Sequence, residues 1–125
     1  MAFYQKRLRD GKNMAAITKQ PWHTDPSFPP YLFMHVKGGS EVKGRYHSLS
    51  NPEEASTALA IYERLLRDYP QIDFDQRIGI ITPYKGQVIE LRKVFRSRFG
   101  PDVSNWVTFN TVDVCCWTLL HGLLI

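Results

Sequence analysis

A hydroxyl group, an aromatic ring and an amide follow directly after an apolar run in the middle of the chain. The run covers residues 78–81, and the residues after it include Thr82, Pro83, Tyr84, Lys85 and Gln87. Hydroxyl and amide groups bind phosphate oxygens, an aromatic ring stacks on a base, and the amides at a helix start add partial positive charge. Pro83 fixes φ at the turn. These residue types indicate contact with a single nucleic-acid strand, and the alternative for Tyr84 is a packing role at the start of a helix.

The segment that follows this turn is basic. Between residues 85 and 98 Glu90 is the only acidic residue, whereas the basic residues are Lys85, Arg92, Lys93, Arg96 and Arg98. On an amphipathic helix such charges form either a solvated outer face or a surface that follows phosphates. Both interpretations stay open at this point.

A strand, a helix and a second strand must position the turn. The apolar run 78–81 predicts a buried strand, residues 85–99 predict a helix that ends at Gly100, and the β-branched run 107–112 predicts a second strand. Two strands joined by one helix form a parallel pair whose carboxyl ends face a ligand. Thr82 and Thr111 both lie at such ends, so Thr111 joins the predicted site.

Other segments complete the predicted fold. A helix should begin after Asn51, because an N-cap asparagine precedes a proline and two carboxylates, and it should stop at Pro70. The run 31–36 predicts a further strand, 38–49 a surface loop or hairpin, and 3–10 a short helix; the prolines make 12–31 irregular. The fold class is therefore α/β, with a mostly parallel sheet of three strands and two crossover helices.

Bulk properties set limits on the class of protein. A chain of 125 residues makes one small domain, and a formal net charge of +4 permits an anionic partner. The two cysteines are adjacent, which disfavours a disulfide and fits a nuclear or cytoplasmic protein. The sequence predicts no signal peptide, because its first residues include charges and lack an apolar stretch. It predicts no membrane partner, because its apolar tail is short and interrupted by His121 and Gly122.

Catalytic and metal-binding patterns are missing from the sequence. It contains no GxxxxGK[ST] phosphate loop, and its four histidines are scattered without HxxxH or HExxH spacing. We therefore predict no catalytic residue, no metal site and no cofactor in this chain.

Six short motifs in order resemble the second RecA-like domain of senataxin-like superfamily 1 helicases, in the nonsense-mediated-decay helicase group. They are FYxxxLxDG at residues 3–11, WHxxxxFxPY at 22–31, a serine-asparagine helix start with Glu54-Ala55 at 50–55, YPxxDF at 69–74, IGIITPYKxQ at 78–87 and the opening of motif V at 107–113. The resemblance covers residues 2–113. It implies a partial RecA-like domain over 1–113 and leaves 114–125 as an apolar tail outside the family pattern.

The resemblance also implies a function. In that family ATP and Mg²⁺ are held by motifs that this chain lacks, so we expect part of an ATP-dependent RNA or DNA helicase that is inactive alone. The implied partners are single-stranded RNA or DNA, bound weakly, and the first RecA-like domain of the parent helicase. The alternative is a small single-stranded nucleic-acid-binding or regulatory module. The tail is either the product of a retained intron, for which a valine after Asp113 fits the GT of an intron start, or part of a true isoform.

Overall fold

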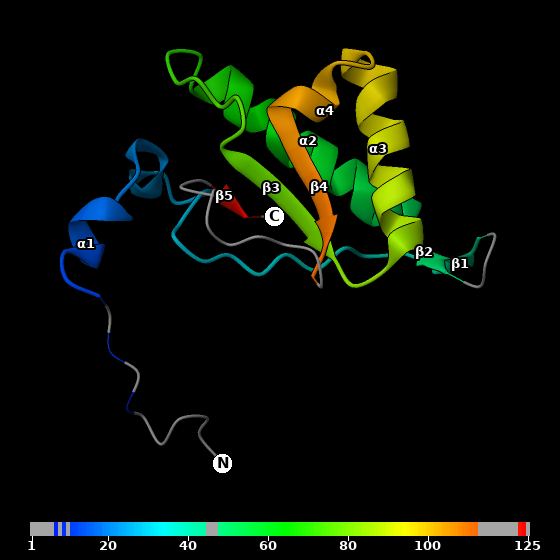
Figure 1. Ribbon diagram of the computed structural model, residues 1–125, viewed down its shortest axis with the longest axis horizontal. Coiled ribbons are helices and arrows are strands. Elements are labelled where there is room, and N and C mark those ends of the chain that lie inside the picture. The colour runs from blue at the N-terminus through cyan, green and yellow to red at the C-terminus, as the bar shows by residue number, and fades with distance from the viewer. Residues whose placement is uncertain (1–6, 8, 10, 45–47, 113–122, 125) are drawn as a thin grey trace. The chain divides into compact units, whose positions relative to one another are not determined.

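Figure 1 shows a computed structural model of the chain, which describes residues 7, 9, 11–44, 48–112 and 123–124. The chain divides into two compact units, Met1–Phe33 and Met34–Ile125. The predicted boundary after residue 113 lies outside the described residues and stays a prediction.

The second unit contains a parallel sheet built around a central buried strand. Strand β3 (Ile78–Thr82) lies between β4 (Val107–Thr111) and β5 (Leu123–Leu124), and both pairings are parallel. Four of the five residues of β3 are β-branched, which suits a strand that is covered on both faces. The predicted α/β class with a parallel sheet is confirmed.

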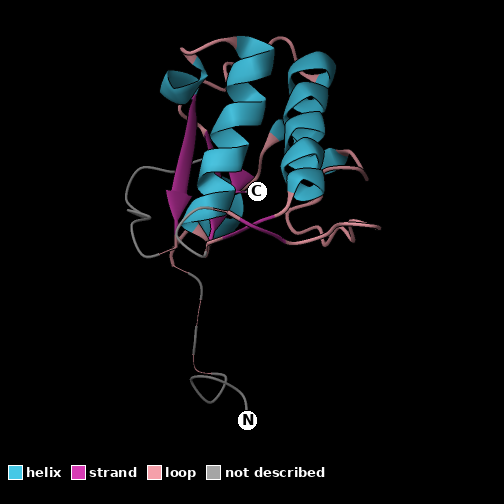
Figure 2. Cartoon of the chain, turned by 90° about the vertical axis from the view of Figure 1, so that its right-hand side faces the viewer, coloured by secondary structure: helices cyan, strands magenta, loops and turns pink. Residues whose placement is uncertain are grey.

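Two long helices pack side by side in this unit (Figures 1 and 2). Helix α2 (Pro52–Asp68) begins as predicted, because the Asn51 side chain accepts hydrogen bonds from the amides of Glu53 and Glu54 at 3.1 and 3.3 Å. Helix α3 (Lys85–Phe99) ends at Gly100, whose φ of 87° favours glycine. Helix α3 connects β3 to β4 together with the short helix α4 (Val103–Trp106), which the sequence did not predict.

An aromatic cluster joins the helices to the sheet. The ring of Phe95 on α3 lies 5.5 Å from Tyr62 on α2 and 5.1 Å from Phe109 on β4, measured between centroids. Phe95 is fully buried, and Phe99 lies 5.4 Å from Tyr62. Burial, and to a lesser degree the negative charge of Asp75, raises the pKa of Tyr62. Phe95 is thus the residue at which α2, α3 and β4 meet.

The predicted strand at 31–36 is wrong. These residues have no regular structure, and the side chains of Tyr31 and Phe33 are 84% and 79% exposed. A strand needs a neighbour for its amide and carbonyl groups, and among the described strands none pairs with this run. Pro29 and Pro30, directly before it, also lack amide donors. An apolar run alone does not show whether a sheet receives it.

The third strand of the sheet comes from elsewhere. It is β5, in the apolar tail 114–125 that we expected to lie outside the family pattern, and it pairs Leu123 with Ile78 and Leu124 with Gly79. The predicted loop or hairpin at 38–49 is a hairpin, in which β1 (Val42–Lys43) pairs antiparallel with β2 (Leu49–Ser50). Helix α2 therefore follows a hairpin strand, and only α3 crosses between parallel strands of the described sheet.

The first unit has short helical turns where the sequence predicted irregular structure. They are α1 (Met14–Ile17) and the 3-10 turn η2 (Pro21–Thr24), which begins with a proline. The ring nitrogen Nδ1 of His23 accepts a hydrogen bond from the Gln20 amide at 3.2 Å. The predicted helix at 3–10 lies almost entirely outside the described residues. In the described part of the chain, no helix has the length and apolar character needed to cross a membrane.

Candidate nucleic-acid interface

The carboxyl ends of β3 and β4 bring Thr82 and Thr111 together, as the sequence predicted. The two threonines are register partners, and the Val112 amide donates to the Thr82 carbonyl at 3.3 Å. Both threonines are buried, with exposed fractions of 8% and 9%. The two threonines therefore lie beneath the surface at this edge of the sheet.

The turn after β3 carries exposed side chains. The Thr82 hydroxyl Oγ1 accepts a hydrogen bond from the Tyr84 amide at 3.3 Å, a local bond that fixes the turn. Tyr84 is the N-cap residue of α3 and is 45% exposed, while Pro83 and Lys85 are also exposed. An accessible aromatic ring thus lies next to an accessible cation, which suits base stacking and phosphate contact.

The amides at the start of α3 already have partners. The Gly86 amide donates to the Ser48 hydroxyl at 2.7 Å, and the Gln87 and Val88 amides donate to the Tyr84 carbonyl at 3.1 and 3.2 Å. We expected partial positive charge from these amides to attract phosphate. In this structure the Ser48 hydroxyl accepts from the Gly86 amide, at the position where a phosphate oxygen was expected.

Gln87 faces away from solvent. Its side chain is buried, its Oε1 accepts from the Asn51 amide at 2.6 Å, and its Nε2 donates to the Asn51 carbonyl at 3.1 Å. The structure thus divides the predicted site residues into two groups. Thr82, Gln87 and Thr111 are buried supports, whereas Pro83, Tyr84 and Lys85 are accessible.

Most cations of α3 have partners within the chain. Arg92 donates to the Phe109 carbonyl at 3.1 Å, Lys93 pairs with Glu90 at 3.2 Å, and Arg98 pairs with Glu63 on α2. Arg96 donates to the Ser104 hydroxyl at 3.4 Å. Lys85 has no ion pair with any residue that the structure describes. Among the described residues, only the first turn of α3 keeps an exposed cation without an ion pair, and the remaining charges of the helix fit the solvated-face interpretation better.

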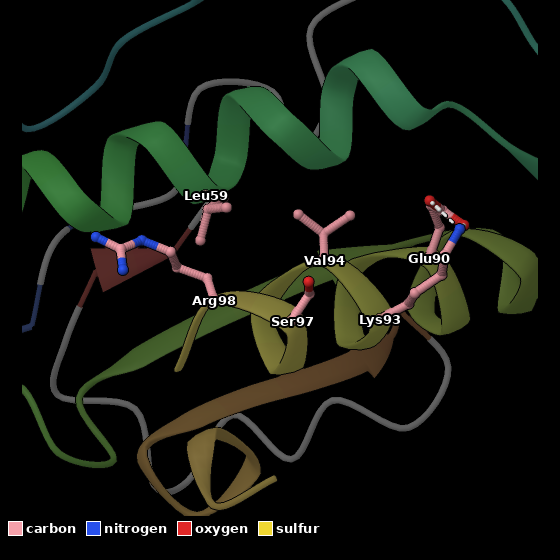
Figure 3. A pocket seen from close by; sticks show the side chains of 6 residues that line it. All are labelled: Leu59, Glu90, Lys93, Val94, Ser97 and Arg98. Carbon is pink, nitrogen blue, oxygen red and sulfur yellow. Dashed lines mark hydrogen bonds and ion pairs between the residues drawn. The ribbon is translucent and has the colours of Figure 1, made fainter. Parts of the chain in front are cut away.

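A shallow hollow of about 410 Å³ lies between α2 and α3 (Figure 3). It is lined by Leu59, Glu90, Lys93, Val94, Ser97 and Arg98. None of the predicted site residues lines it, and its charged residues are engaged in the ion pairs just described. Over the described part of the chain no group of three or more histidine, cysteine or acidic side chains could hold a metal ion.

Sequence reasoning missed the residues that support the turn. Ser48 and Asn51 lie 38 and 36 positions before their partners Gly86 and Gln87. No spacing rule links residues so far apart, so no signal in a single sequence could have identified these pairs. The N-cap role of Asn51 was visible locally, but its bonds to Gln87 were not.

Comparison with known proteins places this sequence in a family. The sequence profile of the AAA domain family matches residues 1–115. The helicase sen1 of Schizosaccharomyces pombe is 39% identical over 111 residues, which is 89% of this chain and 6% of that protein. The helicase SEN1 of Saccharomyces cerevisiae is 38% identical over 113 residues, which is 89% of this chain and 5% of that protein.

A plant relative likewise matches most of this chain over a small part of its own length. The probable helicase MAGATAMA 3 of Arabidopsis thaliana is 34% identical over 113 residues, covering 89% of this chain and 14% of its own length. The chain thus spans only a small part of each of these relatives. It belongs to the AAA domain family, in the group of senataxin-like superfamily 1 helicases.

Proposed function

We propose that this chain is the nucleic-acid-facing part of the second RecA-like motor domain of an ATP-dependent RNA or DNA helicase. The observation that supports this most is the shared edge where β3 and β4 end. There Thr82 and Thr111 are register partners, and Tyr84 and Lys85 are exposed directly after them. Ligands of parallel α/β sheets bind at this edge, and the relatives named above are helicases.

The proposed contacts follow from the chemistry of each accessible group. Tyr84 stacks on a base, because its ring is exposed at the turn and every base offers a π face. Lys85 binds a phosphate, since its ammonium group is exposed and has no competing carboxylate within the described residues. Thr82 acts indirectly through the bond that holds the Tyr84 amide.

The rest of the motor would come from elsewhere. The sequence has no GxxxxGK[ST] loop, so we propose that ATP and Mg²⁺ are held by the first RecA-like domain of the parent helicase. That domain is accordingly the proposed protein partner of this chain. Alone, the chain would bind single strands weakly and hydrolyse nothing.

The purified chain is expected to release no phosphate from ATP above a protein-free blank, with or without single-stranded RNA or DNA. The reason is that phosphoryl transfer needs a phosphate cradle and a metal site, for which the sequence has no motif. A coupled phosphate-release assay measures this. Turnover that a substitution in this chain abolishes would contradict the proposal, whereas turnover that such substitutions leave unchanged would identify a contaminant.

Replacing Tyr84 by alanine is expected to weaken single-strand binding by about 1–3 kcal/mol, the range for loss of one base-stacking contact. Fluorescence anisotropy with a labelled homopolymer measures the affinity. Tyr84→Phe is the matched control and should bind like the parent chain, because the ring is kept. If Tyr84→Ala lowers the melting temperature but leaves the affinity unchanged, Tyr84 packs against the fold and does not stack on a base.

The second candidate function is an independent single-stranded nucleic-acid-binding or regulatory module. One observation favours it: the turn and its supports Ser48, Asn51 and Gln87 all lie in the unit Met34–Ile125. Such a module would have to bind well by itself. A dissociation constant clearly below about 10⁻⁶ M at physiological salt, beyond ordinary non-specific binding, would favour the module over the motor part.

A further inference from the structure

The β1–β2 hairpin is fastened to the start of α3 by two separate sets of bonds. The Ser48 hydroxyl accepts from the Gly86 amide at 2.7 Å, and the Gln87 side chain bonds to both backbone groups of Asn51. Gly86 also allows a close approach, since a Cβ there would lie 2.7 Å from the Leu49 carbonyl oxygen. The hairpin therefore has a fixed position relative to the Thr82–Lys85 turn.

This position places the hairpin next to the proposed strand-binding surface. Figure 1 shows β1 and β2 beside the first turn of α3, at the edge toward which β3 and β4 point. A strand that stacks on Tyr84 and contacts Lys85 would meet the hairpin on one side. The hairpin and the first turn of α3 form one continuous surface, because Ser48 and Gly86 are in direct contact.

The described part of the hairpin segment carries more positive than negative charge. Residues 34–44 and 48–50 contain Lys37 and Lys43 against the single acidic residue Glu41. The Lys43 side chain on β1 is exposed and forms no ion pair with the residues that the structure describes. A free ammonium group on a fixed element suits a phosphate of an extended strand.

We propose that the β1–β2 hairpin forms a second wall of the single-strand surface, with Lys43 binding a phosphate, and that Gln87 is the positioning residue that holds this wall. The inference rests on the proposed function of the Thr82–Lys85 turn. It also assigns Gln87 a new role, because a buried side chain bonded to Asn51 acts on the strand through the hairpin. Occupancy of this surface by single-stranded nucleic acid follows from its positive charge and its continuity with the turn.

The chemistry of the Gln87 link explains why an amide is needed. One side chain must accept a hydrogen bond from the Asn51 amide and donate another to the Asn51 carbonyl. Glutamate keeps the acceptor and loses the donor, while methionine fills a similar volume, has no donor and offers only a weak sulfur acceptor. Gln87→Met therefore cuts this link and leaves the Ser48–Gly86 bond in place.

The first test compares two lysines. Binding of a fluorescein-labelled oligouridylate of about 10 nucleotides, a length within the range of single-strand sites, is measured by anisotropy at several salt concentrations. Lys43→Ala should weaken binding roughly three- to tenfold at low salt and reduce the slope of log affinity against log salt by about 0.7, the value for one phosphate contact on a single strand. Lys93→Ala is the matched control, because it removes the same charge from an exposed lysine that pairs with Glu90. It should leave both quantities nearly unchanged.

The second test measures the coupling between Lys43 and Gln87. In a Gln87→Met background, Lys43→Ala should lose most of its effect on affinity, because the hairpin is no longer held beside the bound nucleic acid. An unchanged Lys43→Ala effect in that background would overturn the positioning role. If Gln87→Met does not fold, as a melting curve shows, Gln87→Glu replaces it in the cycle.

The outcomes separate this inference from the proposed function. If Tyr84→Ala weakens binding while Lys43→Ala behaves like Lys93→Ala, the hairpin wall is refuted and the turn keeps its function. If neither Tyr84→Ala nor Lys43→Ala changes affinity, both proposals fail. A salt-dependent loss in Lys43→Ala together with coupling to Gln87 supports the hairpin wall.

Discussion

Replacing Phe95 by alanine is expected to lower the free energy of unfolding by about 3–5 kcal/mol, the range for removing a large aromatic side chain from a core. Phe95 is fully buried and its ring contacts Tyr62 on α2 and Phe109 on β4. The substitution therefore leaves a cavity at the junction of both helices and the sheet. Because small domains have only about 5–15 kcal/mol of stability, the variant should unfold at much lower urea concentration, as followed by circular dichroism.

Ile89→Ala supplies the control for this experiment. Ile89 lies on the same helix and is 67% exposed, so its truncation should change stability by no more than about 0.5 kcal/mol. A similar small change for Phe95→Ala would contradict the placement of α3 on the sheet. Such a result would also remove the structural basis for the Thr82–Lys85 turn, which leads into α3.

Replacing Gly86 by alanine is expected to destabilise the chain by about 1–3 kcal/mol, although Gly86 lies within the helix α3. Helix propensity alone predicts the opposite sign, since alanine is favoured over glycine by about 1 kcal/mol in a helix interior. The added Cβ would lie 2.7 Å from the Leu49 carbonyl oxygen and 3.0 Å from the Ser48 hydroxyl, so the hairpin must move. Single-strand affinity should fall together with stability.

Gly44→Ala is the matched control within the hairpin. A Cβ at Gly44 would make an ordinary contact of 3.5 Å with the Ser48 carbonyl oxygen, so little should change. Thermal melts and anisotropy titrations of both variants measure the two effects. A stabilised Gly86→Ala would show that the hairpin does not press on α3 in solution, and the hairpin wall would lose its support.

Strong local signals account for the parts of the fold that the sequence predicted. Asn51 and Pro52 determine where α2 starts, and Gly100 determines where α3 ends, because caps act on the residues beside them. The predicted meeting of Thr82 and Thr111 also succeeded, since parallel strands joined by one helix must end at the same edge. Local chemistry and one topological rule were sufficient for these features.

Long-range choices account for what the sequence could not predict. The run 31–36 is apolar enough for a strand, yet the neighbour position beside β3 is taken by β5. In the candidate site, the glutamine at position 87 suits contact with a nucleic-acid strand as well as contact with Asn51. Only the packed structure shows that its side chain bonds to Asn51. These outcomes depend on competition between segments far apart in sequence, which local propensity does not contain.

The order β4-β3-β5 has a consequence for how the chain folds. β4 pairs with five residues of β3 after a connection by α3 and α4, whereas β5 pairs with two residues after a longer connection. Closing the longer connection costs more chain entropy, and the β3–β5 pairing forms fewer residue pairs than the β3–β4 pairing. We therefore expect β3, α3 and β4 to assemble before β5 pairs with β3. During that interval one edge of β3 is open to strands of other chains. Refolding yield should therefore depend on protein concentration even where the final fold is monomeric.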